Sequence, residues 1–284
     1  MQFRLYDDKR LFGMDVLPIL LENEAQNNLL INLATGSSTG PASDWMLATV
    51  EDNGGVAITA LNVSPFNLFL YETSNSPRDD ALDCLVLNLR AIGAAPLGVT
   101  AEAGLARRFT GAFAPSYSYR LHMQISAMRL DKPVSYVNAP GSWRMLEEGD
   151  LFFAPYWEGA FSEDCRAKVF TIRENHDRLL TRIGKHTHYI WEDGIAVSQA
   201  VHGRSTPNGA VINGVYTPPH YRQHGYAASV VSVLSNALLE RGKSFCCLYA
   251  DADNPASTGL YHKLGYYDVC RLEDIRFDND GILS

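Results

Sequence analysis

Residues 215–227 read VYTPPHYRQHGYA and stand between an apolar run and a stretch with helical periodicity. The apolar run, Ala210–Tyr216, predicts a strand. Ala228–Arg241 predicts an amphipathic helix, because its apolar side chains recur every three to four residues. A loop that leads from a strand into a helix presents backbone N–H groups without intrahelical partners. Such a loop suits a phosphate-bearing ligand.

Small residues keep this loop open to a ligand. Gly225 lets the backbone approach a phosphate oxygen without a Cβ in the way, and the small Ala227 keeps the first helical turn open. The pattern over Arg222–Ala227 is RxxGxA, which is neither the GxxxxGK[ST] loop of nucleoside triphosphatases nor the GxGxxG dinucleotide fingerprint. Tyr216–Lys243 holds three basic residues and one Glu, a net charge of +2 in a chain of −8. A small anionic ligand is expected here.

A second motif follows the next predicted strand, the continuously apolar run Phe245–Ala250. It reads NPASTGLYHKLGY over Asn254–Tyr266. Asn and Pro at its start suit a helix N-cap and first helical position, and the Gly near its end suits the residue after the last turn. A helix over Asp253–Leu264 is therefore predicted.

The same order of elements is predicted twice. The N-terminal half is predicted to form a helix at Leu17–Ala34, strands at Asp44–Val50, Val56–Asn62 and Phe66–Tyr71, a helix at Asp79–Ile92 and a strand at Leu97–Ala101. The C-terminal half is predicted to form a helix at Gly149–Phe161 and strands at Thr187–Trp191 and Ile195–Val201, followed by the elements described above. Each half has a Gly-ended hairpin turn, at Asp52–Gly55 and Glu192–Gly194. The recurrence favours a duplicated fold, with chance recurrence in an α/β chain as the alternative.

The sequence therefore predicts an α/β protein of two domains, over residues 1–132 and 141–284. A length of 284 residues exceeds what one core usually fills. The stretch DKPVSYVNAPGSW at Asp131–Trp143 is rich in Pro and Gly and marks the expected join.

Composition excludes several classes of partner. A net charge of −8 disfavours nucleic acid, and no window reaches the roughly 18 apolar residues of a membrane helix. The odd count of five Cys, with Cys246 and Cys247 adjacent, indicates a reduced, cytoplasmic setting. His186 and His188 could belong to a metal site, but without nearby Cys or carboxylate ligands they are expected to be structural or surface residues, and no metal is predicted. The oligomeric state stays open.

With both motifs in this order, Thr187–Val269 resembles the GNAT superfamily of acyl-CoA-dependent N-acetyltransferases. The resemblance implies two tandem GNAT-like domains, each a twisted mixed sheet flanked by helices, and transfer of an acetyl group from acetyl-CoA to a primary amine by direct attack in a ternary complex. It also implies that the strand before the loop splays from the next strand and that its backbone binds the pantetheine arm. The implied cofactor-binding residues are Val215, Tyr216, Thr217, Arg222, Gln223, His224, Gly225, Tyr226, Ala227, Ala228, Asn254 and Ser257. Tyr261 would protonate the departing CoA thiolate.

The general base and the acceptor are not fixed by this pattern. Many members of the superfamily carry a Glu on the strand that corresponds to Ala210–Tyr216, where this chain has no carboxylate. Asp251, Glu192 and Asp193 could act through water or be solvated surface groups. The acceptor could be a small molecule or a peptide. Its pocket could include several residues that could equally belong to the core: Tyr117, Tyr119, His122, Trp143, Tyr156 and Trp157.

The N-terminal half departs further from the superfamily. Ser74–Asp80 stands where the loop motif should be, without Gly and with two carboxylates, and Thr100–Phe109 lacks both the Asn-Pro cap and the Tyr. This half is predicted to be a degenerate domain that shapes the acceptor site or serves as a scaffold. Two other functions stay open. The missing strand carboxylate favours an acyl-CoA sensor without turnover, whereas the acidic charge disfavours an aminoacyl transferase that uses charged tRNA.

Overall fold

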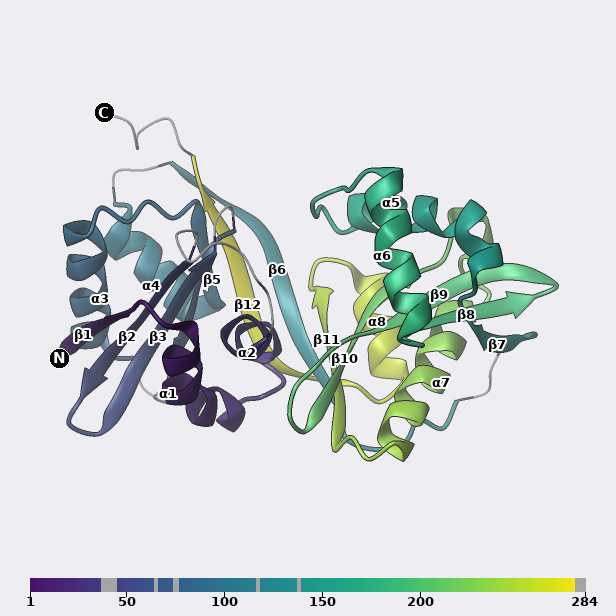
Figure 1. Cartoon of the computed structure of the whole chain (residues 1–284), viewed down its shortest axis with the longest axis horizontal. Coiled ribbons are helices and arrows are strands. Elements are labelled where there is room, and N and C mark those ends of the chain that lie inside the picture. Colours follow the sequence, from purple (N-terminus) through teal and green to yellow (C-terminus); the bar gives the residue numbers. More distant parts are fainter. Residues whose placement is uncertain (37–44, 64–65, 74–76, 116–117, 137–138, 279–284) are drawn as a thin grey trace. The chain divides into compact units, whose positions relative to one another are not determined.

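The computed structural model describes residues 1–36, 45–63, 66–73, 77–115, 118–136 and 139–278 (Figure 1). The chain forms two compact units. The first unit comprises Met1–Ala127, Ala250–Asp253 and Asp268–Ser284, and the second comprises Met128–Tyr249 and Asn254–Tyr267.

The first unit is a mixed sheet with helices on both faces. Its elements are β1 (Gln2–Tyr6), α1 (Lys9–Glu22), α2 (Asn28–Thr35), β2 (Trp45–Asp52), β3 (Gly55–Val63), β4 (Leu68–Glu72), α3 (Asp79–Ala91), β5 (Gly98–Glu102), α4 (Ala103–Phe113), most of β6 (Tyr119–Leu130) and most of β12 (Tyr267–Phe277). The strand order is β1-β2-β3-β4-β5-β12-β6. β4 and β5 run parallel, whereas the pairs from β1 to β4 are antiparallel.

The second unit has a corresponding sheet. Its elements are β7 (Ser142–Met145), the 3₁₀ helix η2 (Glu148–Phe152), α5 (Ala154–Asp164), α6 (Ile172–Gly184), β8 (His188–Asp193), β9 (Ile195–Ser205), β10 (Gly209–Tyr216), the 3₁₀ helix η3 (Pro219–Tyr221), α7 (Tyr226–Glu240), most of β11 (Phe245–Asp251) and α8 (Pro255–Lys263). The strand order is β11-β10-β9-β8-β7. The two strands that α7 connects, β10 and β11, are parallel, and the other pairs are antiparallel.

The predicted repeat is confirmed by these two lists. Each unit begins with a strand and two helices, continues through an antiparallel meander of three strands, and then makes a helical crossover to a parallel strand. A further helix follows in each case, α4 in the first unit and α8 in the second. Two copies of one element order with the same pairing pattern agree with a duplicated fold.

The last strand of the chain belongs to the first sheet. β12 pairs antiparallel with β5, from Leu272↔Glu102 to Arg276↔Gly98. A Cβ on Gly98 would lie 2.1 Å from the carbonyl oxygen of Ile275, so the close approach of the two strands requires glycine there. The sequence-based boundary of 141–284 placed this strand in the C-terminal domain, whereas in the structure it completes the N-terminal unit.

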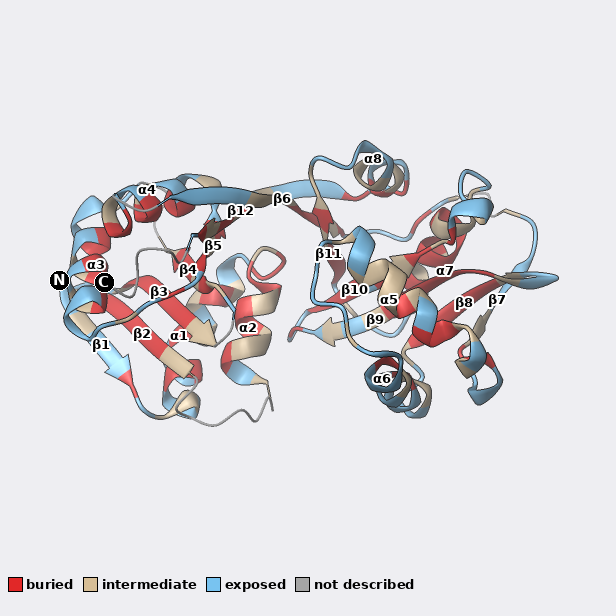
Figure 2. Ribbon diagram, turned by 90° about the horizontal axis from the view of Figure 1, so that it is seen from above, coloured by how far each residue is buried: buried red, intermediate tan, exposed pale blue. Residues whose placement is uncertain are grey.

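The sheet of the first unit separates two apolar clusters, one on each face. Along β2, Leu47 packs in the cluster of α1 and α2, whereas Ala48 and Val50 pack in the cluster of α3 and α4. This alternation follows the two-residue period of a strand whose two faces are both covered. Figure 2 shows the central strands of both units as buried and the outer helix faces as exposed.

Two predicted helices are each divided in the structure. The stretch 17–34 lies in α1 and α2, which are separated by a turn in which the side chain of Asn27 donates to the carbonyl of Leu20 at 3.1 Å. The stretch 149–161 lies in η2 and α5, and Pro155 stands in the first turn of α5. Proline has no N–H to continue the preceding helix, which explains the break. Helices α4 and α6 and strands β1, β6, β7 and β12 were not predicted.

Candidate functional site

Strands β10 and β11 separate at the end of the site motif. Their parallel register runs only from Gly209↔Phe245 to Val211↔Cys247, although β10 continues to Tyr216 and β11 to Asp251. The second half of β10, which contains Val215 and Tyr216, therefore has an edge that β11 does not cover. The splay implied by the resemblance is present.

A β-bulge in β10 accompanies this separation. Asn213 is opposite Val201 of β9, but Tyr216 is opposite Gln199, so one extra residue stands on β10. Gly214 takes a φ of +58°, and its N–H bonds its neighbour's side chain, Asn213 Oδ1, at 2.8 Å. The left-handed backbone explains the glycine and turns the end of the strand.

The loop after β10 is closed by Arg222. Its Nε donates to the carbonyl of Thr217 at 2.9 Å, and its Nη2 bonds Asp164 at the end of α5 at 2.8 Å. Arg222 is thus bound to protein groups on an exposed surface. The backbone of Gln223 has a φ of +67°, which tightens the turn before the helix.

Helix α7 starts without a side-chain cap. Its N-cap is Gly225, with a φ of +84°, and among the described residues no side-chain cap hydrogen bond is made at this start. The N–H groups of Tyr226, Ala227 and Ala228 therefore start a 15-residue helix that lacks the usual capping acceptor. Such a terminus favours an anion through both hydrogen bonding and the helix dipole.

Two further side chains of the loop, those of Tyr226 and His224, contact the protein. The hydroxyl of Tyr226 donates to Asp193 in the β8–β9 turn at 2.6 Å. His224 stacks on Tyr226 with ring centroids 5.6 Å apart, and its Nδ1 lies 2.8 Å from the carbonyl oxygen of Arg222. These contacts hold the side chains of the loop in place. The binding of a ligand by the backbone of the loop stays a prediction.

Helix α8 carries the second motif as expected. The side chain of Asn254 accepts from the N–H of Ser257 at 3.1 Å, and Pro255 follows at the first helical position. This cap uses the amide oxygen of Asn254, so a role in pantetheine binding would fall to its NH₂ group.

Tyr261 lies in α8 with only 8% of its surface exposed. Burial raises the pKa of its phenol well above the ordinary value, although a hydrogen bond with the Ser257 hydroxyl opposes this shift. The group is therefore protonated at neutral pH, as a proton donor must be. Its ring packs edge-on against Tyr266 at 5.8 Å.

Each candidate base already has a protein partner. Glu192 pairs with Arg144 at 2.6 Å, Asp193 accepts from Tyr226, and Asp251 accepts from the N–H of Asp253 at 3.0 Å. None of them is singled out by the structure as a base.

A buried polar network lies behind the bulge. Glu158 of α5 forms an ion pair with Arg182 of α6 at 2.8 Å and accepts from Gln199 Nε2 at 3.0 Å. The same Nε2 donates to the carbonyl of Gly214 at 3.2 Å, and Gln199 Oε1 lies 3.2 Å from His188 Nε2. These residues stand on five separate elements, so no local pattern in the sequence could have brought them together.

The network determines the tautomer of His188. Since Gln199 uses its NH₂ group as a donor toward Glu158 and Gly214, its oxygen must accept the hydrogen bond from His188. His188 is then protonated at Nε2. Burial lowers the pKa of this imidazole to about 4, so it is neutral at pH 7. His188 is thus a buried structural residue, which is one of the two roles, structural or surface, that the sequence analysis expected for it.

We expect the protein to lose stability as the pH falls from about 6.5, the ordinary pKa of His, toward 4, because the folded pKa of His188 is about 4. Between these values the unfolded chain takes up a proton that the folded chain does not, so this stability is fully present above pH 6.5 and is lost on acidification. The shift corresponds to roughly 3 kcal/mol. Denaturant titrations between pH 4 and 7 should show a flatter dependence for His188→Gln, which keeps a donor for Gln199. An identical dependence would contradict the assignment.

In the first unit, the carboxylate of Glu72 lies at the start of α3. Glu72 accepts from the backbone N–H of Arg78 at 2.8 Å, and both of its oxygens bond Arg108 at 3.0 Å. Asp79 and Asp80 occupy the first turn of the same helix. The position that would meet a phosphate is thus filled by an acidic side chain. Residues 74–76 of the predicted degenerate loop lie outside the described residues.

The candidate acceptor residues that the structure describes are divided between the two units. Tyr119 and His122 lie on the part of β6 that belongs to the first unit, and Tyr117 lies outside the described residues. In the second unit, Trp143 stacks on Tyr189 at 5.3 Å and Tyr156 is exposed. Trp157 contacts the site, with its ring centroid 6.1 Å from that of Tyr216.

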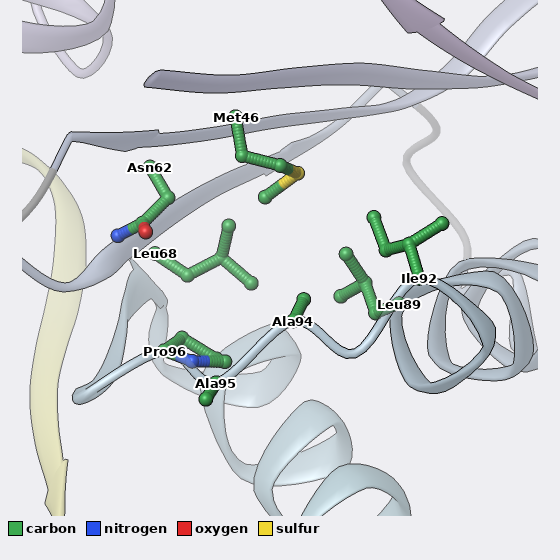
Figure 3. Close-up of a pocket in the computed structure, with 8 residues that line it drawn as sticks. All are labelled: Met46, Asn62, Leu68, Leu89, Ile92, Ala94, Ala95 and Pro96. Carbon is green, nitrogen blue, oxygen red and sulfur yellow. The ribbon is translucent and has the colours of Figure 1, made fainter. Parts of the chain in front are cut away.

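A small apolar cavity lies in the first unit (Figure 3). Its lining residues are Met46, Asn62, Leu68, Leu89, Ile92, Ala94, Ala95 and Pro96. The volume of about 220 Å³ is below the roughly 300 Å³ at which small-molecule sites begin. None of the predicted site residues contributes to it. Within the residues that the structure describes, no group of three or more His, Cys, Asp or Glu side chains could hold a metal ion.

Comparison with known proteins agrees with this geometry. Residues 192–273 match the family model of FR47-like proteins. The fold matches a GCN5-related N-acetyltransferase from Sphaerobacter thermophilus over 97% of this chain and 95% of that one, at 16% identity and a TM-score of 0.66. At this identity the likeness shows that the chain has the fold of the GNAT superfamily.

Two further GNAT structures cover nearly the whole chain. An acetyltransferase from Colwellia psychrerythraea has a TM-score of 0.60 at 8% identity, covering 98% of this chain and 100% of that one. A tandem GNAT protein from the clavulanic acid biosynthesis pathway has a TM-score of 0.51 at 11% identity, covering 98% of each chain. No curated protein is significantly similar to the chain. At these identities the likeness establishes the tandem GNAT fold, which agrees with the repeat of elements in the two units.

None of the helices that the structure describes combines the length and apolarity needed to span a lipid bilayer.

Proposed function

We propose that the chain is an N-acetyltransferase that transfers an acetyl group from acetyl-CoA to a primary amine, at a site in the second unit. The observation that carries the proposal is the splay of β10 from β11 after Val211, directly before the uncapped start of α7 at Gly225. The open strand edge offers backbone groups to an extended ligand, and the helix start offers N–H groups to its phosphates.

Each part of the site then has a role in a ternary complex. The backbone of Val215, Tyr216 and Thr217 binds the pantetheine arm. The loop and first helical turn, Arg222 to Ala228, bind the pyrophosphate, while Asn254 and Ser257 flank the arm on α8. Acetyl-CoA supplies an acetyl thioester, and the amine nitrogen forms a bond to its carbonyl carbon as the carbon–sulfur bond breaks. Tyr261 donates its proton to the departing sulfur.

The proposal assigns no protein base. The amine must lose a proton to become nucleophilic. Glu192, however, forms an ion pair with Arg144, and Asp193 and Asp251 each accept a hydrogen bond from another group of the protein. The same observation favours a second candidate, a sensor that binds acyl-CoA without turnover. An aminoacyl transferase that uses charged tRNA is disfavoured, because the chain has a net charge of −8.

A CoA-release assay tests the proposal. Acetyl-CoA is offered together with a panel of small amines, amino acids and peptides, and free thiol is measured. Release that depends on one class of amine supports the transferase and identifies the acceptor. Calorimetric binding of CoA without release from any member of the panel would favour the sensor. The proposal places the reaction in the cytoplasm, as the cysteine content indicates.

We expect one CoA to bind per chain, in the second unit. In the first unit, Glu72 takes the N–H of Arg78 at the start of α3, and the like charge of Asp79 and Asp80 would repel a phosphate. Titration calorimetry with CoA should give a stoichiometry near one. A stoichiometry near two would show that the first unit also binds, and would contradict its assignment as degenerate.

A further inference from the structure

The extra carbonyl group of the β10 bulge is held by a side chain. A bulge leaves one residue out of the strand ladder, and the carbonyl of Gly214 instead accepts from Gln199 Nε2 at 3.2 Å. Gly214 lies two residues before Tyr216, where β10 is already separated from β11. The direction of this carbonyl therefore affects how the last residues of the strand present their backbone groups.

Gln199 is itself held in one orientation from both ends. Its NH₂ group also donates to Glu158 Oε1 at 3.0 Å, and its oxygen accepts from His188. An amide rotated by 180° would point its oxygen at Glu158 and at the carbonyl of Gly214, both of which are acceptors. Only one orientation satisfies all three neighbours.

The ion pair behind Gln199 fixes the position of this amide. Glu158 is 5% exposed, and its second oxygen lies 2.8 Å from Arg182 Nη1. The positive charge of Arg182 balances the buried carboxylate, which would otherwise be costly to keep ionised. The ionised carboxylate in turn strengthens its hydrogen bond from Gln199. Neutral His188 adds no charge at pH 7.

We propose that Gln199 is a positioning residue of the acyltransferase site, which acts by holding the Gly214 carbonyl and thereby the open end of β10. This inference rests on the proposed function, because it gives the network a role in turnover and not only in folding. Gln199 is fully buried, so it contacts neither substrate. A displacement of about 1 Å at the reacting groups can lower a rate on the order of 10²-fold, which makes the angle of this strand end important.

Gln199→Asn tests the proposal with little loss of polarity. The shortened amide cannot reach both Glu158 and Gly214. We expect turnover to fall by at least about tenfold, while the affinity for CoA changes by less than about threefold, because the phosphates bind at the start of α7. Gln199→Met, which removes the donor entirely, should lower turnover further.

Thr206→Val is the matched control. Thr206 is buried, and its hydroxyl accepts from the N–H of Gly209 at 3.1 Å. Gly209 is the first residue of β10, at the opposite end of that strand from the bulge. This variant loses a comparable hydrogen bond far from the bulge. It should lower the unfolding temperature while turnover stays within about twofold of wild type. If Gln199→Asn behaves in the same way, the network serves stability alone and the proposal is overturned.

A measurement without turnover tests the same geometry. Nitrogen NMR of the imidazole of His188 should show Nε2 protonated and Nδ1 unprotonated between pH 6 and 8 in the wild-type protein. A proton on Nδ1 would mean that the amide of Gln199 points the other way, and would sink the proposal even if the enzyme is active. Absence of CoA binding and of turnover in the wild type, with the Nε2 tautomer present, would refute the proposed function and with it a role of Gln199 in turnover, while leaving the hydrogen-bond network intact.

Discussion

Replacing Gly225 by aspartate is expected to weaken CoA binding by at least about 100-fold, the largest effect that we expect from a single substitution in the loop. The carboxylate would stand at the N-cap of α7, where it can accept the N–H bonds of the first turn and repel a pyrophosphate. A Cβ at this position would also lie 3.3 Å from the hydroxyl of Tyr136 and 3.6 Å from the Cβ of Ala139, so the neighbourhood leaves little spare room. Titration calorimetry with CoA gives the affinity directly.

The matched control is Gly225→Asn, which has nearly the same shape without the charge. Asn and Asp both tolerate the left-handed backbone that Gly225 adopts, at a φ of +84°. Both variants should therefore fold similarly, as judged by circular dichroism and the unfolding temperature. The asparagine variant should keep more of the affinity than the aspartate variant. Equal, wild-type-like affinity in both would show that the phosphates bind elsewhere.

The local parts of this site could be predicted from the sequence. The strand, loop and helix around Gly225 are encoded within about 30 residues, and their turn and cap residues have defined backbone preferences. The predicted strand at 210–216 and helix at 228–241 differ from β10 and α7 by at most two residues at each end. Asn254 and Pro255 likewise mark the start of α8 because each suits one helical position.

The distant contacts could not be predicted. The pattern of residues 267–277 is compatible with a strand, but nothing in it identifies β5, about 170 residues earlier, as its partner. The buried network depends on α5, α6, β8 and β9 meeting behind Gly214. In the sequence, the residues of this network cannot be distinguished from ordinary surface or strand residues. A single sequence shows the periodicity of each element, but it does not show which side chains will contact one another.

The starts of the two crossover helices differ by one carboxylate contact. At corresponding positions, the crossover helix starts at Gly225 without a side-chain cap in one unit and is approached by Glu72 in the other. Arg108 holds Glu72 in place through two bonds of 3.0 Å. An internal carboxylate at a helix start takes up one of the donors there and repels an external anion.

Replacing Tyr261 by phenylalanine is expected to lower turnover by roughly 10²-fold while changing the affinity for acetyl-CoA little. The substitution keeps the ring, which packs edge-on against Tyr266, and removes only the hydroxyl. A thiol has an ordinary pKa of about 8.5, so a departing thiolate is already fairly stable near neutral pH. Because its pKa is raised, the phenol of Tyr261 is a weaker acid than an ordinary tyrosine. The role that we propose for it is therefore a hydrogen bond to the developing sulfur anion, with proton transfer as the carbon–sulfur bond breaks.

The pH dependence and a neighbouring variant separate this role from packing. Because burial raises the pKa of Tyr261 far above neutrality, its phenol stays protonated throughout the usual assay range, and any loss of activity at moderately alkaline pH must have another cause. Ser257→Ala removes the hydroxyl that bonds Tyr261 but leaves the proton donor, so it should lower turnover by less than Tyr261→Phe. Steady-state kinetics of both variants, with CoA affinity measured by calorimetry, provide the comparison. A Tyr261→Phe variant that turns over at nearly the wild-type rate would reduce Tyr261 to a core residue.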